Sequence, residues 1–146
     1  MSDICIRPMQ AEDIDAVLTI EHQSFSLPWS REAFQAEVCN NLACYLVMEM
    51  DGLMIGYGGM WIVLDEAHIT NVAILPDYRE QGLGKRLFAS MIHQANSRGT
   101  IRMTLEVRVS NTAAQKLYKG FGFTVCGLRR GYYTDNQEDA LIMWRQ

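Results

Sequence analysis

The segment over residues 71–87 limits the possible folds of this chain more than any other, because it combines a strand, a polar loop and the start of a long helix. Gly82 and Gly84 stand where that helix begins, and the first amides of a helix have no intrahelical partner. Such N–H groups, at the positive end of the helix dipole, can bind a phosphate group that the small glycines allow to come close. Arg79 and Lys85 add positive charge there. The alternative, that the glycines only shape a turn beside solvated basic residues, stays open.

Two well-known phosphate loops do not fit this segment. The Rossmann fingerprint requires a third glycine where Leu87 stands, and the Walker A motif requires Ser or Thr where Arg86 stands. The sequence therefore predicts a pyrophosphate loop of another kind.

Hydrophobic periodicity places the remaining elements around this loop. Helices are expected over residues 11–24, from Ser30 onward, and over 83–98 and 111–119; strands are expected over 4–7, 43–50, 53–62, 66–74, 103–107, 123–129 and 139–144. The order β-α-α-β-β-β-α-β-α-β-β predicts an α/β (α+β) sheet between helices and excludes a repeating βαβ alternation.

The composition is that of an ordinary globular domain, with 49% hydrophobic and 21% charged residues among 146, so we expect one domain over residues 1–146. The formal net charge of −4 argues against a general binder of nucleic acid or anionic membranes. The N-terminus lacks the apolar stretch of a signal peptide, and no window reaches the roughly twenty apolar residues that cross a bilayer. We therefore expect a cytoplasmic protein.

The four cysteines and three histidines give no sign of a metal site or a thiol nucleophile. No Cys-x-x-Cys pair and no zinc-finger spacing occur, so reduced and mostly buried thiols are expected, without a metal. The isolated histidines are interpreted as surface or structural residues, and none is assigned to catalysis: His22, His68 and His93.

The arrangement Arg79-x-x-Gly82-x-Gly84, after a strand ending Val-Ala-Ile-x-Pro, resembles the acetyl-CoA loop of the GNAT superfamily of N-acetyltransferases. The later run Asn111-x6-Tyr118-x2-Gly-Phe-Gly-Phe is similar to its second signature. The resemblance implies the GNAT fold, a mixed central sheet of about six to seven strands flanked by four helices. It also implies acetyl-CoA as cosubstrate.

Three further segments resemble the RimI-type ribosomal-protein-alanine N-acetyltransferases. They are Phe-Ser-Leu-Pro-Trp-Ser at 25–30, Leu-Glu-Val-Arg-x-Ser-Asn at 105–111, and Gly-Tyr-Tyr at 131–133 followed by Glu-Asp-Ala-Leu-Ile-Met at 138–143. This resemblance implies an N-terminal peptide of a ribosomal protein as the acceptor. From the net charge, we expect no direct contact with nucleic acid or a membrane.

The family resemblance also implies the cofactor-binding residues. The pantetheine arm would pair with the backbone of Val72, Ala73 and Ile74, and Asn111 would hydrogen-bond the cofactor. The pyrophosphate would lie against the loop that comprises Arg79, Glu80, Gln81, Gly82, Leu83, Gly84 and Lys85. Glu80 and Gln81 depart from the more basic loops of relatives. Asn111 and Tyr118 are seven residues apart, which predicts one shared helix face.

Glu106 and Tyr118 are the candidate catalytic residues. Glu106 alternates with the apolar Leu105 and Val107, and the resemblance makes it the general base for the attacking amine. Without the resemblance, a solvent-facing carboxylate or an ion pair with Arg108 is the simpler interpretation. The resemblance makes the Tyr118 hydroxyl the acid for the departing thiolate, and a packed aromatic is its alternative.

Aromatic and apolar loop residues on either side of this site are candidates for gripping an extended acceptor peptide: Leu27, Trp29, Tyr132 and Tyr133. Filling of the core by Trp29 and Tyr132 is the alternative. The leading hypothesis is direct attack of an N-terminal alanine amine on acetyl-CoA, without a covalent acetyl-enzyme. Two other readings stay open: a GNAT enzyme acting on a polyamine, an antibiotic or lysine, and a non-catalytic acyl-CoA-binding module.

Overall fold

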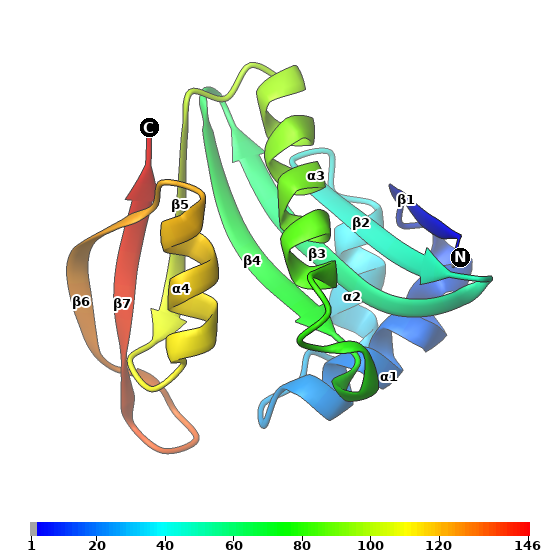
Figure 1. Ribbon diagram of the computed structural model, residues 1–146, viewed down its shortest axis with the longest axis horizontal. Helices are drawn as coiled ribbons and strands as arrows, with labels where there is room; N and C mark the ends of the chain where they lie inside the picture. Colours follow the sequence, from blue (N-terminus) through cyan, green and yellow to red (C-terminus); the bar gives the residue numbers. More distant parts are fainter. Residues whose placement is uncertain (1–2) are drawn as a thin grey trace.

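The computed structural model describes residues 3–146, in which seven strands form one mixed sheet in the order β1-β2-β3-β4-β5-β7-β6 (Figure 1). The strands are β1 Ile4–Pro8, β2 Ala43–Met50, β3 Leu53–Val63, β4 Glu66–Ile74, β5 Arg102–Arg108, β6 Thr124–Tyr133 and β7 Glu138–Arg145. The helices are η1 Ala11–Asp13, α1 Ile14–Ser24, α2 Arg31–Val38, η2 Pro76–Tyr78, α3 Leu83–Ser97 and α4 Thr112–Gly120. The predicted fold class and element order are confirmed.

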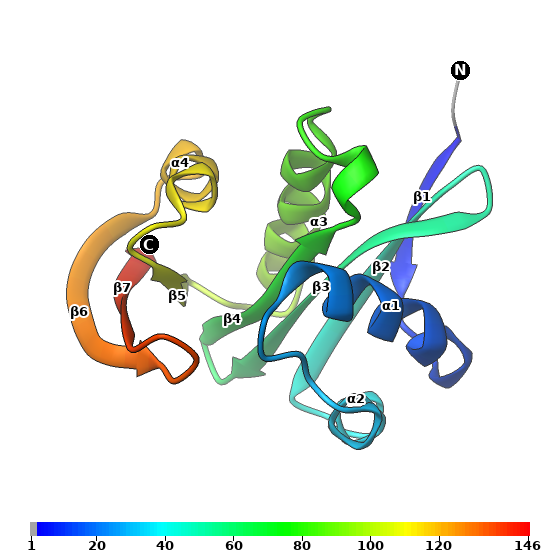
Figure 2. The ribbon, with the colours of Figure 1, turned by 90° about the horizontal axis from the view of Figure 1, so that it is seen from below.

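Helices cover both faces of the sheet: α1 and α2 lie on one face, and α3 and α4 on the other (Figure 2). Because side chains alternate along a strand, the strands supply two apolar cores. The first contains Phe34 and Tyr57 with α1 and α2, and the second contains Phe88 and Tyr118 with α3 and α4.

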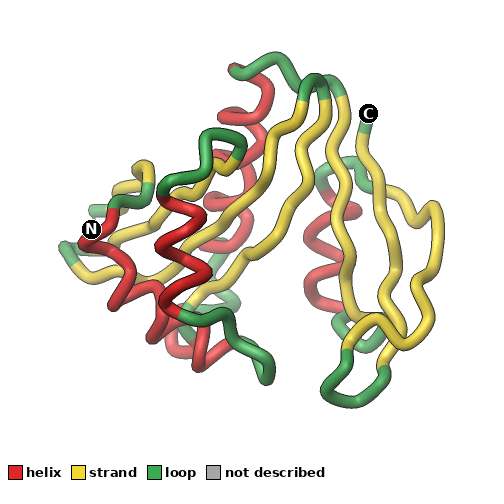
Figure 3. Tube along the Cα trace, turned by 180° about the vertical axis from the view of Figure 1, so that it is seen from behind, coloured by secondary structure: helices red, strands yellow, loops and turns green. Residues whose placement is uncertain are grey.

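The sheet opens in its middle, between β4 and β5. These parallel strands pair only at Glu66–Arg102, Ala67–Met103 and His68–Thr104. Beyond His68 they diverge, as Figures 1 and 3 show, while β5 continues in antiparallel pairing with β7. Among residues 3–146, the edge of β4 that faces β5 therefore has no strand partner from Ile69 to Ile74.

The structure corrects several details of the sequence analysis. The first helix is η1 followed by α1, and Phe25 lies beyond it in extended backbone. Strand β6 extends four residues past the expected end, so Tyr132 and Tyr133 belong to a strand rather than a loop. The thiols are also more accessible than expected, since only Cys44 is buried and the exposed ones are Cys5, Cys39 and Cys126.

None of the helices within residues 3–146 has the length and apolar character needed to cross a bilayer. In the same part of the chain, no three His, Cys, Asp or Glu side chains are grouped so that they could hold a metal ion.

Gly59 of β3 gives a test of the packing between the sheet and α2. A Cβ atom at this position would overlap the buried Tyr45 ring, whose hydroxyl is held by Thr70 and Asn71. We expect Gly59→Ala to lower the free energy of unfolding by about 1–3 kcal/mol, as overpacking does. Urea unfolding followed by circular dichroism measures this.

The same substitution at the end of α4 provides the control. A Cβ atom on Gly120 meets no atom within 4 Å. We therefore expect Gly120→Ala to be neutral or stabilising. Equal stability of the Gly59→Ala variant and the wild type would contradict the packing argument.

Candidate active site

The start of α3 has uncapped amides, as the glycine pattern predicts. Gly82 adopts a left-handed conformation with φ of 79°, and no side chain caps the helix. The first main-chain bond into the helix runs from Arg86 N to Gly82 O at 3.2 Å. In the described part of the chain, the amides of Leu83, Gly84 and Lys85 therefore have no acceptor, and this end of the helix can receive an anion.

Arg79 shapes the loop before α3. Its Nε donates to the carbonyl oxygen of Ile74 at 2.8 Å, and its Nη2 donates to Ser24 Oγ at 3.2 Å. The guanidinium thereby ties the end of β4 to α1. The Arg79 side chain therefore braces the loop, and its contact with phosphate stays a prediction. The exposed Lys85 side chain makes no hydrogen bond or ion pair with residues 3–146.

Main-chain groups of β4 point alternately toward β3 and toward the opening. Leu75 N donates to Ile55 O at 2.7 Å, so the main-chain groups of Leu75 face β3. Hydrogen-bonded pairs recur at every second residue of an antiparallel ladder, and Ala73 is paired with Tyr57, so the N–H and C=O of Ala73 also face β3. Those of Val72 and Ile74 consequently face the opening, in agreement with the bond from Arg79 to Ile74 O. Of the three residues expected to pair with a ligand, Val72 and Ile74 have the correct orientation and Ala73 does not.

Glu106 lies on β5 beside this opening, on the face opposite Leu105 and Val107, as expected. Its side chain is only 10% exposed. His68 Nε2 lies 3.0 Å from one carboxylate oxygen, and the Tyr132 hydroxyl donates to the other at 3.2 Å. The hydrogen bond from His68 lowers the pKa of Glu106 below its ordinary value, although burial opposes this. Glu106 is therefore an ionised carboxylate at neutral pH.

The ion pair between Glu106 and Arg108 that the sequence left open does not form. Arg108 instead donates to Asp135 at 2.8 Å and to Glu138 at 3.1 Å. The guanidinium also stacks over the Tyr133 ring, with 4.0 Å from Cζ to the ring centroid. This leaves the Glu106 carboxylate to His68 and Tyr132.

His68 is the residue that sequence reasoning missed. It was expected to be isolated, whereas parallel pairing of His68 with Thr104 brings it beside Glu106, two residues further along β5. No local motif signals a contact between residues 38 positions apart; only the alternation of polar residues on both strands could have suggested a shared face.

Tyr118 lies on the other face of the sheet. Its ring packs against Phe88 at 5.1 Å and Phe123 at 6.1 Å between centroids, so the packed-aromatic interpretation is correct for the ring. Burial raises the pKa of the hydroxyl to about 12, which keeps it protonated at neutral pH. The hydroxyl makes no hydrogen bond to any residue from 3 to 146, so it is available as a donor.

The prediction that Asn111 and Tyr118 share one helix face is wrong. Asn111 is the N-cap of α4, and its Oδ1 accepts a hydrogen bond from Ala114 N at 3.1 Å. The cap fixes the oxygen, and the amide nitrogen remains for a ligand. Its contact with a cofactor stays a prediction.

The candidate acceptor residues lie on two segments, the loop at 25–30 and strand β6, and Tyr132 of β6 hydrogen-bonds Glu106. Trp29 is half-buried against Phe34, with 5.5 Å between ring centroids, so it partly fills the core. Leu27 is 52% exposed and Tyr132 is 43% exposed. These two side chains therefore present apolar surface, whereas Trp29 mainly fixes the loop that carries Leu27.

Two hydrogen bonds hold that loop in place. Glu21, which is buried in α1, accepts from the Trp29 amide at 2.8 Å. Ser26 Oγ donates to Asp135, in the turn between β6 and β7. The loop at 25–30 thus contacts the far half of the sheet across the opening.

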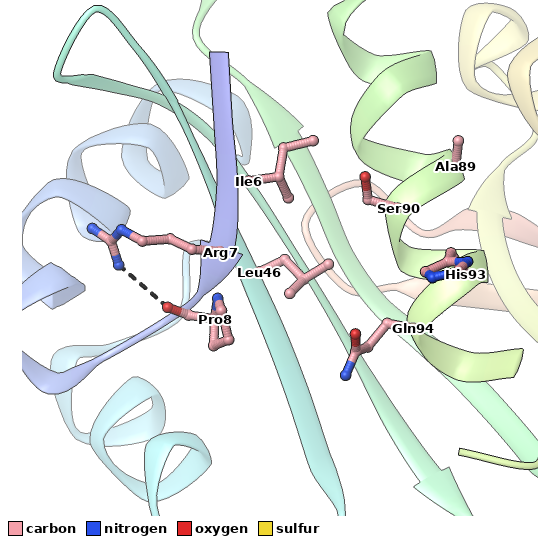
Figure 4. Close-up of a pocket in the computed structure, with 8 residues that line it drawn as sticks. All are labelled: Ile6, Arg7, Pro8, Leu46, Ala89, Ser90, His93 and Gln94. Carbon is pink, nitrogen blue, oxygen red and sulfur yellow. Dashed lines mark hydrogen bonds between the residues drawn. The ribbon is translucent and has the colours of Figure 1, made fainter. Parts of the chain in front are cut away.

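A separate depression lies between β1, β2 and α3, as Figure 4 shows. Its lining includes Ile6, Leu46, Ser90 and His93. None of the candidate site residues contributes to it, so this depression is separate from the candidate site.

Comparisons with known proteins show the family of this chain. The model of the acetyltransferase (GNAT) family matches residues 14–123. A protein of Bacillus subtilis (strain 168), provisionally named ribosomal protein bS18-alanine N-acetyltransferase, is 53% identical over 140 residues, which cover 95% of this chain and 93% of that protein. The ribosomal protein bS18-alanine N-acetyltransferase of Escherichia coli (strain K12) is 39% identical over 142 residues, 94% of each chain.

Solved structures show the same similarity. The crystal structure of the Escherichia coli ribosomal-protein-S18-alanine N-acetyltransferase aligns with a TM-score of 0.91 at 36% identity, covering 98% of this chain and 93% of that one. Arabidopsis thaliana NAA60 in complex with acetyl-CoA aligns with a TM-score of 0.86 at 21% identity, covering 97% and 98%, and shares the fold. The chain therefore belongs to the GNAT family of acetyltransferases, within its group of ribosomal-protein-alanine N-acetyltransferases.

Proposed function

We propose that this enzyme transfers the acetyl group of acetyl-CoA to the α-amino group of an N-terminal alanine, and that its acceptor is ribosomal protein bS18. The acceptor follows from the names of relatives that match nearly the whole chain. The chemistry rests on one observation: an ionised carboxylate, Glu106, and a protonated hydroxyl, Tyr118, lie on opposite faces of a sheet that is open between β4 and β5.

The residues of the opening fit the parts of acetyl-CoA, the activated acetyl donor of the family. The free amides of Leu83, Gly84 and Lys85 suit its diphosphate. The free edge of β4 at Val72 and Ile74 suits the amide groups of pantetheine, which can pair as an added strand would. A main-chain N–H of this edge can also polarise the thioester carbonyl.

Glu106 accepts the proton of the attacking amine. An N-terminal amine has a pKa of about 7.7–8.0, so a large part of it is protonated at neutral pH. The nitrogen becomes much more acidic as it bonds to the carbonyl carbon, and an ionised carboxylate can then take its proton, directly or through one water. His68 and Tyr132 leave Glu106 ionised for this step.

Tyr118 donates to the sulfur as the carbon–sulfur bond breaks. Its raised pKa keeps the hydroxyl protonated at neutral pH, and the ring packs against Phe88 and Phe123 in an apolar setting. A donor in an apolar setting stabilises developing negative charge more than it would in water.

Replacement of Glu106 tests the base. We expect Glu106→Gln to lower kcat by about 100-fold or more, since general base catalysis contributes about that much. The Kd for acetyl-CoA should change little, because Glu106 lies away from the free amides of α3. Thiol release with an alanine-starting peptide measures turnover, and Glu32→Gln, an exposed position on α2, is the matched control.

Replacement of Tyr118 tests the acid. Tyr118→Phe keeps the ring packing and removes only the hydroxyl, so we expect an unchanged melting temperature and a kcat lower by about 10-fold or more. Pre-steady-state thiol release, monitored with the same peptide, reports the step directly. Wild-type rates in this variant would remove Tyr118 from the mechanism.

The acceptor class is tested with a pair of peptides of one sequence. We expect acetylation of a peptide that begins with alanine and contains lysine, and at least about 100-fold slower acetylation of its N-terminally blocked counterpart, whose only amine is the lysine side chain. Mass spectrometry locates the acetyl group. Equal rates would favour a lysine or small-amine acceptor over an N-terminal one.

A further inference from the structure

We propose that His68 is a positioning residue for Glu106: its ring N–H holds the carboxylate in one orientation and keeps it ionised. This inference rests on the proposed role of Glu106 as the base and goes beyond it, because it assigns a role to a second residue, which acts through Glu106. The geometry carries it, since His68 Nε2 lies 3.1 Å and 3.0 Å from the two carboxylate oxygens.

Backbone pairing within the sheet fixes the position of His68. His68 is the last residue of β4 that pairs with β5, immediately before the strands diverge. A carboxylate two residues along β5 on the same face is therefore within reach of its ring. The contact stands at the point where the opening begins.

The surroundings of Glu106 make this donor necessary. The carboxylate is 10% exposed, and an ionised group that leaves water must be compensated by hydrogen bonds. The titratable and charged groups that face it are His68 from β4, with Arg129, Tyr132 and Tyr133 from β6. Strand β7 contributes the apolar Ile142 at the paired position.

His68 is the stronger of the two hydrogen-bonding partners. It is the largest influence that lowers the pKa of Glu106, and it contacts both oxygens, whereas Tyr132 contacts one at 3.2 Å. Without His68, burial remains and the donor is gone, so the pKa of Glu106 rises. The carboxylate would then become protonated, and useless as a base, at a higher pH than in the wild type.

The experiment compares His68→Ala with the wild type across pH. The ionisation of the peptide amine affects both enzymes equally, so it cancels when the kcat/KM of the variant is divided by that of the wild type. We expect this ratio to fall by at least about 3-fold between about pH 8 and about pH 5. His68→Gln retains an N–H donor of similar reach and should keep its ratio within about 2-fold over the same range.

Two further measurements separate the possible failures. His93→Ala removes an exposed histidine from α3 and is the control. The ratio of its kcat/KM to that of the wild type should not change with pH. In protein labelled with ¹³C-glutamate, the Glu106 carboxyl resonance, assigned by its loss in Glu106→Gln, should titrate at higher pH in His68→Ala than in the wild type. This readout needs no turnover.

A pH-independent ratio together with an unchanged Glu106 titration would overturn the positioning role. Full activity of Glu106→Gln would instead remove the proposed base. The titration would still report whether His68 controls its ionisation.

Discussion

The limited contact between β4 and β5 is the constraint on which the rest of this structure depends. Three residue pairs join the two strands, and everything beyond them in β4 keeps a free main-chain edge inside the sheet. In an ordinary sheet, Glu106 and Tyr118 would be separated by a continuous layer of backbone. The early divergence allows one ligand to reach groups that belong to different faces.

Contacts on each side of the sheet hold the two halves in this arrangement. On one face, Phe88 of α3 packs against Tyr118, Phe121 and Phe123, so an aromatic cluster joins the helix that follows β4 to the segment that follows β5. On the other face, the bond from Ser26 to Asp135 joins the loop at 25–30 to the turn between β6 and β7. The opening is therefore bounded by packing on one side and by polar contact on the other.

Local patterns in the sequence predict the parts of the site that local chemistry controls. Gly82 marks a helix start without a side-chain cap, and the alternation around Glu106 gives its face, because both follow from a few adjacent residues. The contact of His68 with Glu106 depends on the register of two parallel strands, which no short pattern encodes. The position of Asn111 was predicted wrongly, because the helix begins one residue later than expected. At the N-cap, a side chain bonds to the end of the helix and does not lie along one of its faces.

The bond from Arg79 to the carbonyl oxygen of Ile74 has a consequence for any extended molecule that docks along β4. This carbonyl is the last acceptor that faces the opening, and it is already occupied. In the proposed complex, a ligand that paired along β4 would therefore meet the Arg79 guanidinium at Ile74, the last residue of the strand. Arg79 would in this way limit the length of the β4 edge that a bound ligand can use.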